Sequence, residues 1–257
     1  AIPDRHAAAN RGQACFKGKF GLDFVNRREK LKTPLVRRDG SLVESSWHDA
    51  LDLVADRLAN YRGDQFALLA SPRGTNEDNY VAQKFTRTVM GTNNVDISSN
   101  LRPELVRPLG EILDYPAATN SIWEMEGSSC FLVVSSNMTE EQNVAAVPIK
   151  KAVKDGATLI VIDQRATELT RFAKIWLRPR PGSEAALVGG MLRVILDESL
   201  DDHAFLANSC DNLDELRNAL WAFDLLKVER ITGLSRNEIQ AAARVFATTK
   251  PASILYG

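Results

Sequence analysis

Polar residues that follow two apolar runs are the part of this sequence best suited to bind a small molecule. The first set, Ser135, Ser136 and Asn137, follows the run Cys130–Val134, and the second, Asp163, Gln164 and Arg165, lies at the end of the run Thr158–Asp163. The carboxylate of Asp163 can accept hydrogen bonds from a ribose or from the edge of a base. Asp163 can also simply cap the next helix, and the spacing alone leaves both interpretations open.

The elements around these residues are predicted to form a βαβ unit. Both runs are apolar throughout instead of alternating, which is typical of parallel strands buried on both faces. The segment between them is long enough for a crossover helix, with Pro148 in its first turn and Gly156 at its end. In such sheets ligands bind beyond the carboxyl ends of the strands, where the two polar sets stand.

A second polar loop follows another apolar run. The predicted strand Phe66–Ala70 leads into SPRGTNEDN, and a helix over about 76–90 follows. Gly74 lets backbone N–H groups approach an anion, and the start of the helix adds its positive end. Arg73 can add a charge-assisted contact to phosphate. An ordinary strand-to-helix turn explains the same residues.

Composition narrows the class of partner. The chain has 257 residues and a formal net charge of -1, so neither a nucleic acid nor an anionic membrane is expected to bind it. No apolar run approaches the roughly 20 residues that span a bilayer, and no signal peptide is visible. The three cysteines, Cys15, Cys130 and Cys210, have unrelated spacings, which predicts a reducing compartment and a cytoplasmic location.

The remaining sequence is predicted to be scaffold in an α/β fold. Residues 1–45 are irregular, with a short strand at Leu35–Arg38. Helices are expected over about 47–62, 184–196, 201–209, 213–223 and 235–247, before a final buried strand at 253–257. Trp221, Phe223 and Phe246 are expected in the core rather than against a ligand.

Several longer segments together resemble the catalytic α subunit of formate dehydrogenases. They are CFKGKFGLDFVNR, LKTPLVRRDGSLVESSWHDALDLVADRL, SPRGTNEDNYVAQKFTR, GTNNVD, GATLIVIDQRATELTRFAKIWLRPRPGSEAAL and ITGLSRNEIQAAARVFATTKPASILYG. These enzymes belong to the molybdopterin oxidoreductases, which carry molybdenum or tungsten on a bis-(molybdopterin guanine dinucleotide). The resemblance implies domains of the formate dehydrogenase/DMSO reductase type, with parallel sheets flanked by helices and a Rossmann-like dinucleotide-binding unit.

The resemblance also implies roles for residues at matching positions. Cys15 corresponds to the last of four thiolate ligands of a [4Fe-4S] cluster, and Lys17 to a lysine on the electron path between cluster and pterin. Contacts to pterin or phosphate are implied for Arg73, Gly74, Thr75 and Asn76. Contacts to one guanine dinucleotide arm are implied for Asn137, Asp163, Arg165, Gly182 and Ser183.

Two features depart from the family pattern. The three cluster cysteines that normally precede Cys15 are absent, so the chain is expected to be a fragment or one piece of a split subunit. Formate dehydrogenases also place a cysteine or selenocysteine, then His, shortly after NVD, and gapless alignment puts Arg102 and Pro103 there. A guanidinium cannot ligate a metal, which leaves Ser98 or Ser99 as an oxygen ligand if the loop path shifts.

The resemblance favours a piece of a formate-oxidising enzyme that does not oxidise formate by itself. Its expected partners are the rest of the catalytic subunit, or a chain that supplies it, and iron–sulfur electron-transfer subunits. A non-catalytic subunit on the same fold, as in respiratory NADH dehydrogenase, is one alternative. An NAD-dependent dehydrogenase domain is another, although the sequence has no GxGxxG.

Three regions are expected along the chain. Residues 1–45 form the irregular end of the iron–sulfur region, and residues 46–102 form a partial α/β unit. Residues 103–257 form a dinucleotide-binding-like α/β domain for the guanine dinucleotide of the pterin.

Overall fold

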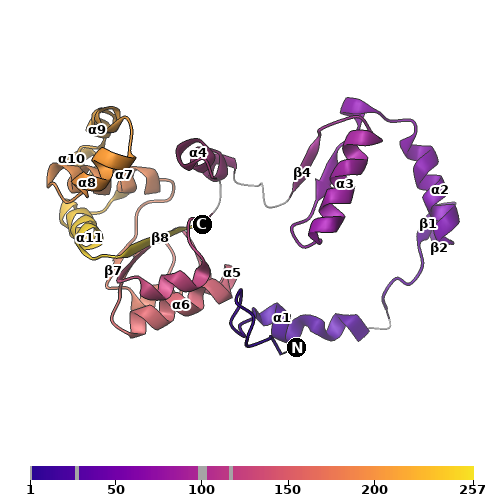
Figure 1. Ribbon diagram of the computed structural model, residues 1–257, viewed down its shortest axis with the longest axis horizontal. Coiled ribbons are helices and arrows are strands. Elements are labelled where there is room, and N and C mark those ends of the chain that lie inside the picture. The colour runs from indigo at the N-terminus through magenta and orange to yellow at the C-terminus, as the bar shows by residue number, and fades with distance from the viewer. Residues whose placement is uncertain (1, 27–28, 98–102, 116–117) are drawn as a thin grey trace. The chain divides into compact units, whose positions relative to one another are not determined.

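The computed structural model describes residues 2–26, 29–97, 103–115 and 118–257. The chain divides into two compact units, one formed by Ala1–Val25 with Asn120–Gly257 and the other by Asn26–Thr119 (Figure 1). The three-region division at residues 45 and 102 stays a prediction about the family's domains.

A four-stranded sheet forms the centre of the first unit. Its strands are β5 (Cys130–Val134), β6 (Thr158–Ile162), β7 (Ile175–Leu177) and β8 (Ala252–Tyr256). They lie in the order β7-β6-β5-β8, and every neighbouring pair is parallel. Cys130 lies opposite Thr158, so the predicted parallel pair is confirmed. The α/β class with a parallel sheet is likewise confirmed.

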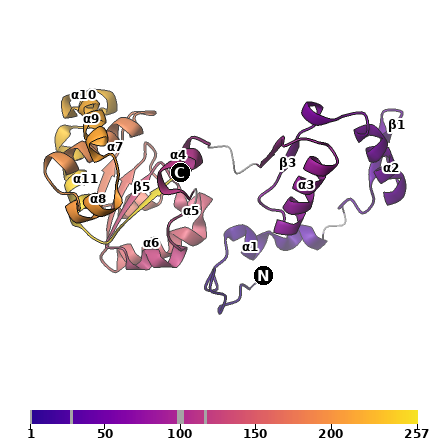
Figure 2. The same cartoon turned by 45° about the horizontal axis from the view of Figure 1, so that its top comes forward.

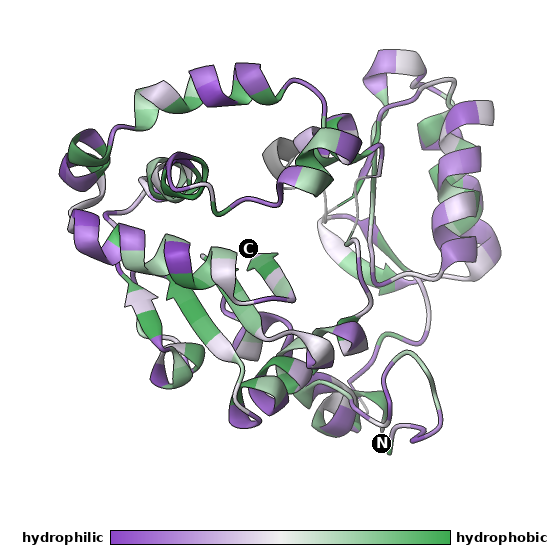
Figure 3. Cartoon of the chain, turned by 60° about the vertical axis from the view of Figure 1, so that its left-hand side comes forward, coloured by the Kyte–Doolittle hydropathy of each residue, from purple (hydrophilic) through white to green (hydrophobic). Residues whose placement is uncertain are grey.

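Both faces of the sheet are buried at its inner strands β5 and β6, which is why these two strands are apolar throughout. The final strand, β8, lies at the edge of the sheet, where Ile254 is 55% and Tyr256 46% exposed, so the prediction that it is buried is wrong. On one face, the side chains of alternate strand residues pack against α6 (Asn143–Lys154): Phe131, Val133, Leu159 and Val161 with Ala145, Ala146 and Ile149. On the other face, strand residues pack against α7 (Glu184–Asp197), α10 (Leu225–Thr232) and α11 (Arg236–Thr248): Cys130, Leu132, Ile160 and Ile162 with Leu187, Met191, Val228 and Ile239. The helices on opposite sides of the strands are visible in Figure 2, and the strands are largely green, hydrophobic, in Figure 3.

The path of the chain through the sheet changes direction once. It runs from β5 to β6 and on to β7, and then returns through α7, α8 (His203–Ser209), α9 (Leu213–Leu220), α10 and α11 to β8 on the other side of β5. In open parallel sheets this reversal opens a crevice beyond the carboxyl ends of the strands, where ligands bind. Here the reversal lies between β5 and β8.

One helix begins earlier than its sequence pattern indicates. The short helix α5 (Met138–Glu141) follows β5, and α6 begins at Asn143, so Pro148 lies inside α6 and not in its first turn as predicted. Pro148 is buried there. Because proline has no N–H, the carbonyl of Val144 lacks its usual hydrogen-bond donor in the helix. The proline ring adds apolar surface to the buried face of α6.

The N-terminal part of this unit is held by one aromatic side chain. It contains α1 (Phe16–Phe20) and a 3-10 helix at Gly21–Asn26. The indole N–H of Trp123 donates to the carbonyl of Ala9 at 3.0 Å, and the guanidinium of Arg11 lies 5.0 Å from the centre of the same ring. Glu126 accepts from Lys151 at 2.8 Å and lies 3.9 Å from Arg11.

The second unit has two small sheets. The strands β1 (Leu35–Arg38) and β2 (Ser41–Glu44) form an antiparallel hairpin, and β3 (Leu68–Ala70) pairs in parallel with β4 (Val95–Ile97). In the described part of this unit, the α-helices are α2 (Trp47–Leu58), α3 (Asn76–Thr88) and α4 (Pro103–Leu113), and a 3-10 helix covers Gly63–Gln65. Among the described residues of this unit, only Thr86 and Met90 are buried. In neither unit do the described residues form a helix of the length and apolarity that a membrane span requires.

Candidate functional site

The carboxyl edge of the four-stranded sheet brings two chain segments very close together. The N–H of Gly257 donates to the carbonyl of Val134 at 3.1 Å, which continues the pairing of β8 with β5. A Cβ at Gly257 would collide with the main-chain oxygen of Ser135, so only glycine allows this approach. Ser135 itself has a φ of 47°, and its N–H donates to Ile162 at 2.8 Å. The turn after β5 is therefore fixed between β6 and β8.

The polar residues after β5 are buried. Ser136 is 4% exposed and Asn137 is 7% exposed. The hydroxyl of Ser136 donates to the sulfur of Met138 at 3.1 Å, and the side-chain oxygen of Asn137 accepts from Thr139 at 3.2 Å. The carbonyl of Asn137 also accepts from the N–H groups of Glu140 and Glu141 in α5. Buried polar groups need such partners, and these contacts hold both side chains at the sheet edge.

Asp163 follows β6 on the neighbouring strand and is only 3% exposed. Its Oδ1 accepts from the N–H of Arg165 at 2.8 Å and lies 4.0 Å from Nε of the same arginine, whose side chain is 74% exposed. Its own N–H donates to Leu177 at 3.1 Å, and its carbonyl accepts from the indole of Trp176 at 2.8 Å. The carboxylate belongs to a local turn and does not cap a helix, and its contact with a ribose or a base stays a prediction.

Gly182 and Ser183 precede α7, and a side-chain hydrogen bond ties this helix start to the turn after β6. The amide of Gln164 donates to the carboxylate of Glu184 in the first turn of α7. Gly182 has a φ of 79°, and a Cβ there would meet open space. The hydroxyl of Ser183 donates back to Arg180 at 2.5 Å and does not cap α7.

The structure thus brings Asn137, Asp163 and Arg165 to neighbouring strand ends, with Gly182 and Ser183 linked to them through Gln164. Sequence reasoning missed three contributors: Trp176, Gly257 and Thr167. Thr167 is 6% exposed, and its hydroxyl oxygen has no hydrogen-bond partner among the described residues. No sequence pattern marks that last position, because an unpaired buried hydroxyl follows from the folded structure alone.

The loop before α3 lies in the second unit. Arg73, Gly74, Thr75 and Asn76 are all exposed. Thr75 and Asp78 form a capping box, in which the Thr75 hydroxyl accepts from the N–H of Asp78 and the Asp78 carboxylate accepts from the N–H of Thr75, both at 3.1 Å. The capping box therefore provides hydrogen-bond acceptors for two of the backbone N–H groups at the start of α3. Arg73 remains as an exposed charged side chain beside Gly74.

Cys15 lies immediately before α1 and is half-buried, while Lys17 is exposed within that helix. Cys130 is buried in the sheet core and Cys210 is exposed after α8. Across the described ranges, no three His, Cys, Asp or Glu side chains come together around a common point. The described residues therefore do not fit a four-thiolate cluster. Arg102, Ser98 and Ser99 lie outside the described residues, and Pro103 begins α4.

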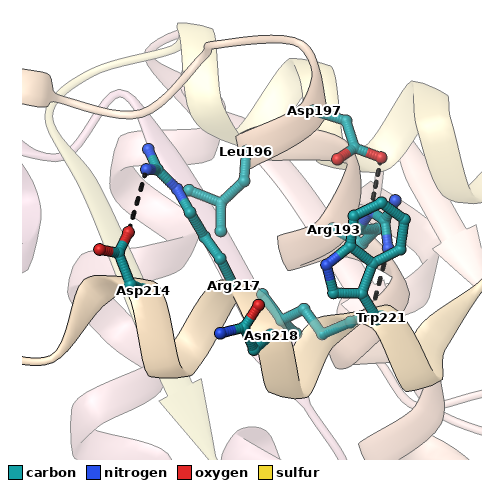
Figure 4. A pocket seen from close by; sticks show the side chains of 8 residues that line it. Arg193, Leu196, Asp197, Asp214, Arg217, Asn218 and Trp221 are labelled. Carbon is teal, nitrogen blue, oxygen red and sulfur yellow. Dashed lines mark hydrogen bonds and ion pairs between the residues drawn. The ribbon is translucent and has the colours of Figure 1, made fainter.

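A concave surface lies between α7 and α9, away from the carboxyl edge of the sheet, with a volume of about 490 Å³. Its charged side chains are paired within the surface, Arg193 with Asp197 at 2.6 Å and Arg217 with Asp214 at 3.7 Å (Figure 4). The guanidinium of Arg193 also lies 4.1 Å from the ring centre of Trp221. Trp221 is 68% exposed, so its predicted place in the core is wrong, whereas Phe223 and Phe246 do pack against the core as predicted. Trp221 can lie outside because the Arg193 guanidinium covers one face of its ring.

Comparison with known proteins gives consistent matches. A family model described as molybdopterin oxidoreductase matches residues 30–255. The F420-dependent formate dehydrogenase 1 subunit alpha of Methanococcus maripaludis is 36% identical over 99% of this chain and 38% of its own length. Formate dehydrogenase H of Escherichia coli is 38% identical over 96% of this chain and 36% of its own length. The solved structure of acetylene hydratase from Pelobacter acetylenicus has a TM-score of 0.74 at 26% identity, covering 95% of this chain and 34% of its own.

Proposed function

Because the chain belongs to the molybdopterin oxidoreductase family, which it matches over residues 30–255, we propose that it forms part of a formate dehydrogenase-type catalytic subunit. Formate dehydrogenase α subunits are similar to it over nearly its whole length, although it spans little more than a third of theirs. The family implies a molybdopterin cofactor with molybdenum or tungsten. The fold alone does not fix the reaction, since acetylene hydratase shares it.

We propose that the carboxyl edge of the four-stranded sheet, a Rossmann-like arrangement, binds one guanine dinucleotide arm of this cofactor. The observation that carries the proposal is the reversal of strand order between β5 and β8, with buried polar side chains at the adjoining strand ends. The donor and acceptor set fits a nucleotide: the carboxylate of Asp163, the amide of Asn137, and the Arg165 guanidinium, which is largely exposed.

The bound cofactor supplies the redox chemistry of the metal, and the residues of this chain bind and orient it. Asp163 accepts from the base or the ribose, Arg165 faces the negative phosphates, and the Gly182-Ser183 turn closes the edge. Arg73, Gly74, Thr75 and Asn76 contact pterin or phosphate in this proposal, with Arg73 supplying the charge.

Electron transfer and partners form a separate part of the proposal. Cys15 is one ligand of a [4Fe-4S] cluster and Lys17 lies on the electron path, with iron–sulfur subunits as partners of the assembly. The described residues supply one thiol near α1, and a four-thiolate cluster needs three more at the same point. The three unpaired cysteines support a reducing compartment, and on that ground we place the protein in the cytoplasm.

A non-catalytic subunit on the same fold is the second candidate function. Arg102 stands where the resemblance expects the metal-ligating cysteine or selenocysteine, and an arginine cannot replace that ligand. Metal and pterin analysis of the purified protein separates the two candidates. A catalytic role requires molybdenum or tungsten together with pterin, and a structural role requires neither.

The test of the dinucleotide site is Asp163→Asn in the full protein that contains this chain. The amide cannot accept two charge-assisted hydrogen bonds, each worth about 1.5–3 kcal/mol, so guanine nucleotide released on denaturation should fall at least tenfold per mole of protein. Asp155→Asn is the matched control, since Asp155 is exposed at the opposite, amino end of β6. Equal nucleotide content in the two variants would contradict the site.

A further inference from the structure

The main chain of Asp163 is held at both of its polar groups by β7. Its N–H donates to the carbonyl of Leu177 at 3.1 Å, which is an ordinary parallel-sheet contact. Its carbonyl instead accepts from a side chain, the indole N–H of Trp176, at 2.8 Å. The indole thus takes the place of the next main-chain donor, and the pairing of β6 with β7 ends there. Beyond this point the chain turns away from the sheet.

The turn that follows carries the Asp163 carboxylate. Its Oδ1 accepts from the N–H two residues later, on Arg165, at 2.8 Å, which is the geometry of an Asx turn. That bond requires the peptide between Asp163 and Gln164 to keep its orientation. The oxygen of this same peptide is the atom that Trp176 holds. A rotation of the peptide would break the indole contact and the carboxylate contact together.

Trp176 is itself held in place on two sides. It packs with the apolar cluster on the α6 face of the sheet. The guanidinium of Arg178 lies 4.9 Å from its ring centre, and the same arginine donates to the carbonyl of Gln164 at 3.5 Å. Trp176 and Arg178 therefore engage two consecutive carbonyls of the turn, those of Asp163 and Gln164.

We propose that Trp176 is a positioning residue for nucleotide recognition: its indole N–H fixes the turn so that the Asp163 carboxylate faces the ligand in one orientation. This inference rests on the proposed dinucleotide site and extends it to a residue that makes no ligand contact. A carboxylate that must accept from two donors at once is sensitive to orientation, because hydrogen bonds weaken steeply away from linear geometry. Trp176 is therefore expected to set selectivity more than overall affinity.

The experiment measures binding of three probes to the 257-residue chain by equilibrium dialysis: GDP, IDP and 2′-deoxy-GDP. IDP lacks the exocyclic amino group of guanine, and 2′-deoxy-GDP lacks a ribose hydroxyl. Two ratios of dissociation constants follow from these measurements, IDP to GDP and 2′-deoxy-GDP to GDP. Asp163→Asn first identifies which of these two ratios depends on the carboxylate. Trp176→Phe, which keeps an aromatic ring but loses the N–H, should reduce that same ratio about 3- to 10-fold. Trp176→His, which keeps a ring N–H, should recover part of it.

A packing role for Trp176 gives a different pattern. Trp176→Phe would then lower the melting temperature and weaken all three probes equally, with the probe ratio unchanged, and that result would overturn the inference. The outcome in which Asp163→Asn changes the ratio but Trp176→Phe does not leaves the dinucleotide site standing and removes only the role of Trp176. A wild-type chain that binds none of the probes at millimolar concentration would overturn both proposals.

Discussion

Thr167 lies in the same loop as the Asp163 turn and presents an unusual buried group. Its hydroxyl oxygen is sealed from solvent and has no partner among the described residues. Its carbonyl, in contrast, accepts from the hydroxyl of Thr170 at 2.7 Å. A buried hydroxyl without a partner costs about 1–3 kcal/mol, whereas a hydroxyl that donates contributes about 1 kcal/mol. The same substitution at the two threonines is therefore expected to change the free energy of unfolding in opposite directions.

We predict that Thr167→Val raises the free energy of unfolding by about 1 kcal/mol, because valine has nearly the same shape and removes the unpaired group. Thr170→Val should lower it by about 1 kcal/mol. Urea denaturation of the ligand-free chain measures both. A loss of stability in Thr167→Val would mean that its hydroxyl has a partner, such as a bound water, and would refute the assignment.

At this scale the sequence predicted which polar residues follow the strands but not which residues contact them. The polar residues at 137 and 163 were found because parallel strands end there. The contact from Trp176 to the Asp163 carbonyl was not predictable, because it joins a side chain to a main-chain atom thirteen residues away in a register that only the folded sheet defines. Thr167 escaped notice since an unpaired group has no sequence pattern.

Among the elements, α7 lies unusually close to the 3-10 helix at Trp221–Phe223. A Cβ at Gly189 would come within 2.6 to 2.8 Å of the Phe223 ring, which is closer than real contacts allow. Gly189→Ala should destabilise the fold by about 1–3 kcal/mol, despite the better helix propensity of alanine. Gly127→Ala is the control, since a Cβ there meets open space.

Thermal denaturation of the two variants provides the comparison. Adding Phe223→Leu to Gly189→Ala should restore part of the loss, because the smaller side chain makes room for the new methyl group. If Gly189→Ala is as stable as its control, α7 and the 3-10 helix are farther apart than described.

An ion pair joins the end of α7 to α11. Arg244 binds both carboxylate oxygens of Glu198, at 2.7 and 2.8 Å. The hydrogen bonds from Arg244 lower the pKa of Glu198 below its ordinary value of 4.5. A lowered pKa in the folded state means that the pair contributes stability above pH 4.5, and that this contribution is lost as pH falls through the folded-state pKa.

Glu198→Gln tests this pH dependence. At pH 7 the variant should be slightly less stable than the wild type. The difference should shrink as the pH falls below about 4.5, where the unfolded chain begins to bind a proton at Glu198, and should vanish below the lower folded-state pKa. Chemical denaturation at about pH 7, 5 and 3.5 gives the three differences. A difference that stays constant with pH would show that the pair contributes nothing electrostatic.

Helix and strand types followed well from apolar periodicity, and the exceptions have physical causes. Proline at 148 is usually read as the start of a helix, yet the buried face of α6 accepts it because the ring adds apolar contact there. Trp221 was expected inside because tryptophan is large and apolar. Its place outside depends on Arg193, a residue on another helix whose guanidinium covers the ring.

For the whole molecule, the two units differ in how much of their surface they bury. The unit around the four-stranded sheet has a core on each sheet face. In the other unit, α2 buries none of its residues, all of which are described. The proposed nucleotide contacts of Asn137, Asp163 and Arg165 lie in the first unit, and those of Arg73 to Asn76 lie in the second. The resemblance implied ligand contacts for both groups of residues. It did not show that the first group lies on a unit with a buried core and the second on a unit with few buried residues.

Hydrogen exchange on the ligand-free and GDP-saturated chain tests the central claim most directly, because it locates binding without a mutation. We predict slower exchange in three segments: 135–137 after β5, 163–167 after β6, and 182–186 at the start of α7. The surface between α7 and α9, at residues 214–221, should remain unchanged, as its charges are already paired. Protection at that surface with none at the three turns would contradict a nucleotide site at the carboxyl edge of the sheet.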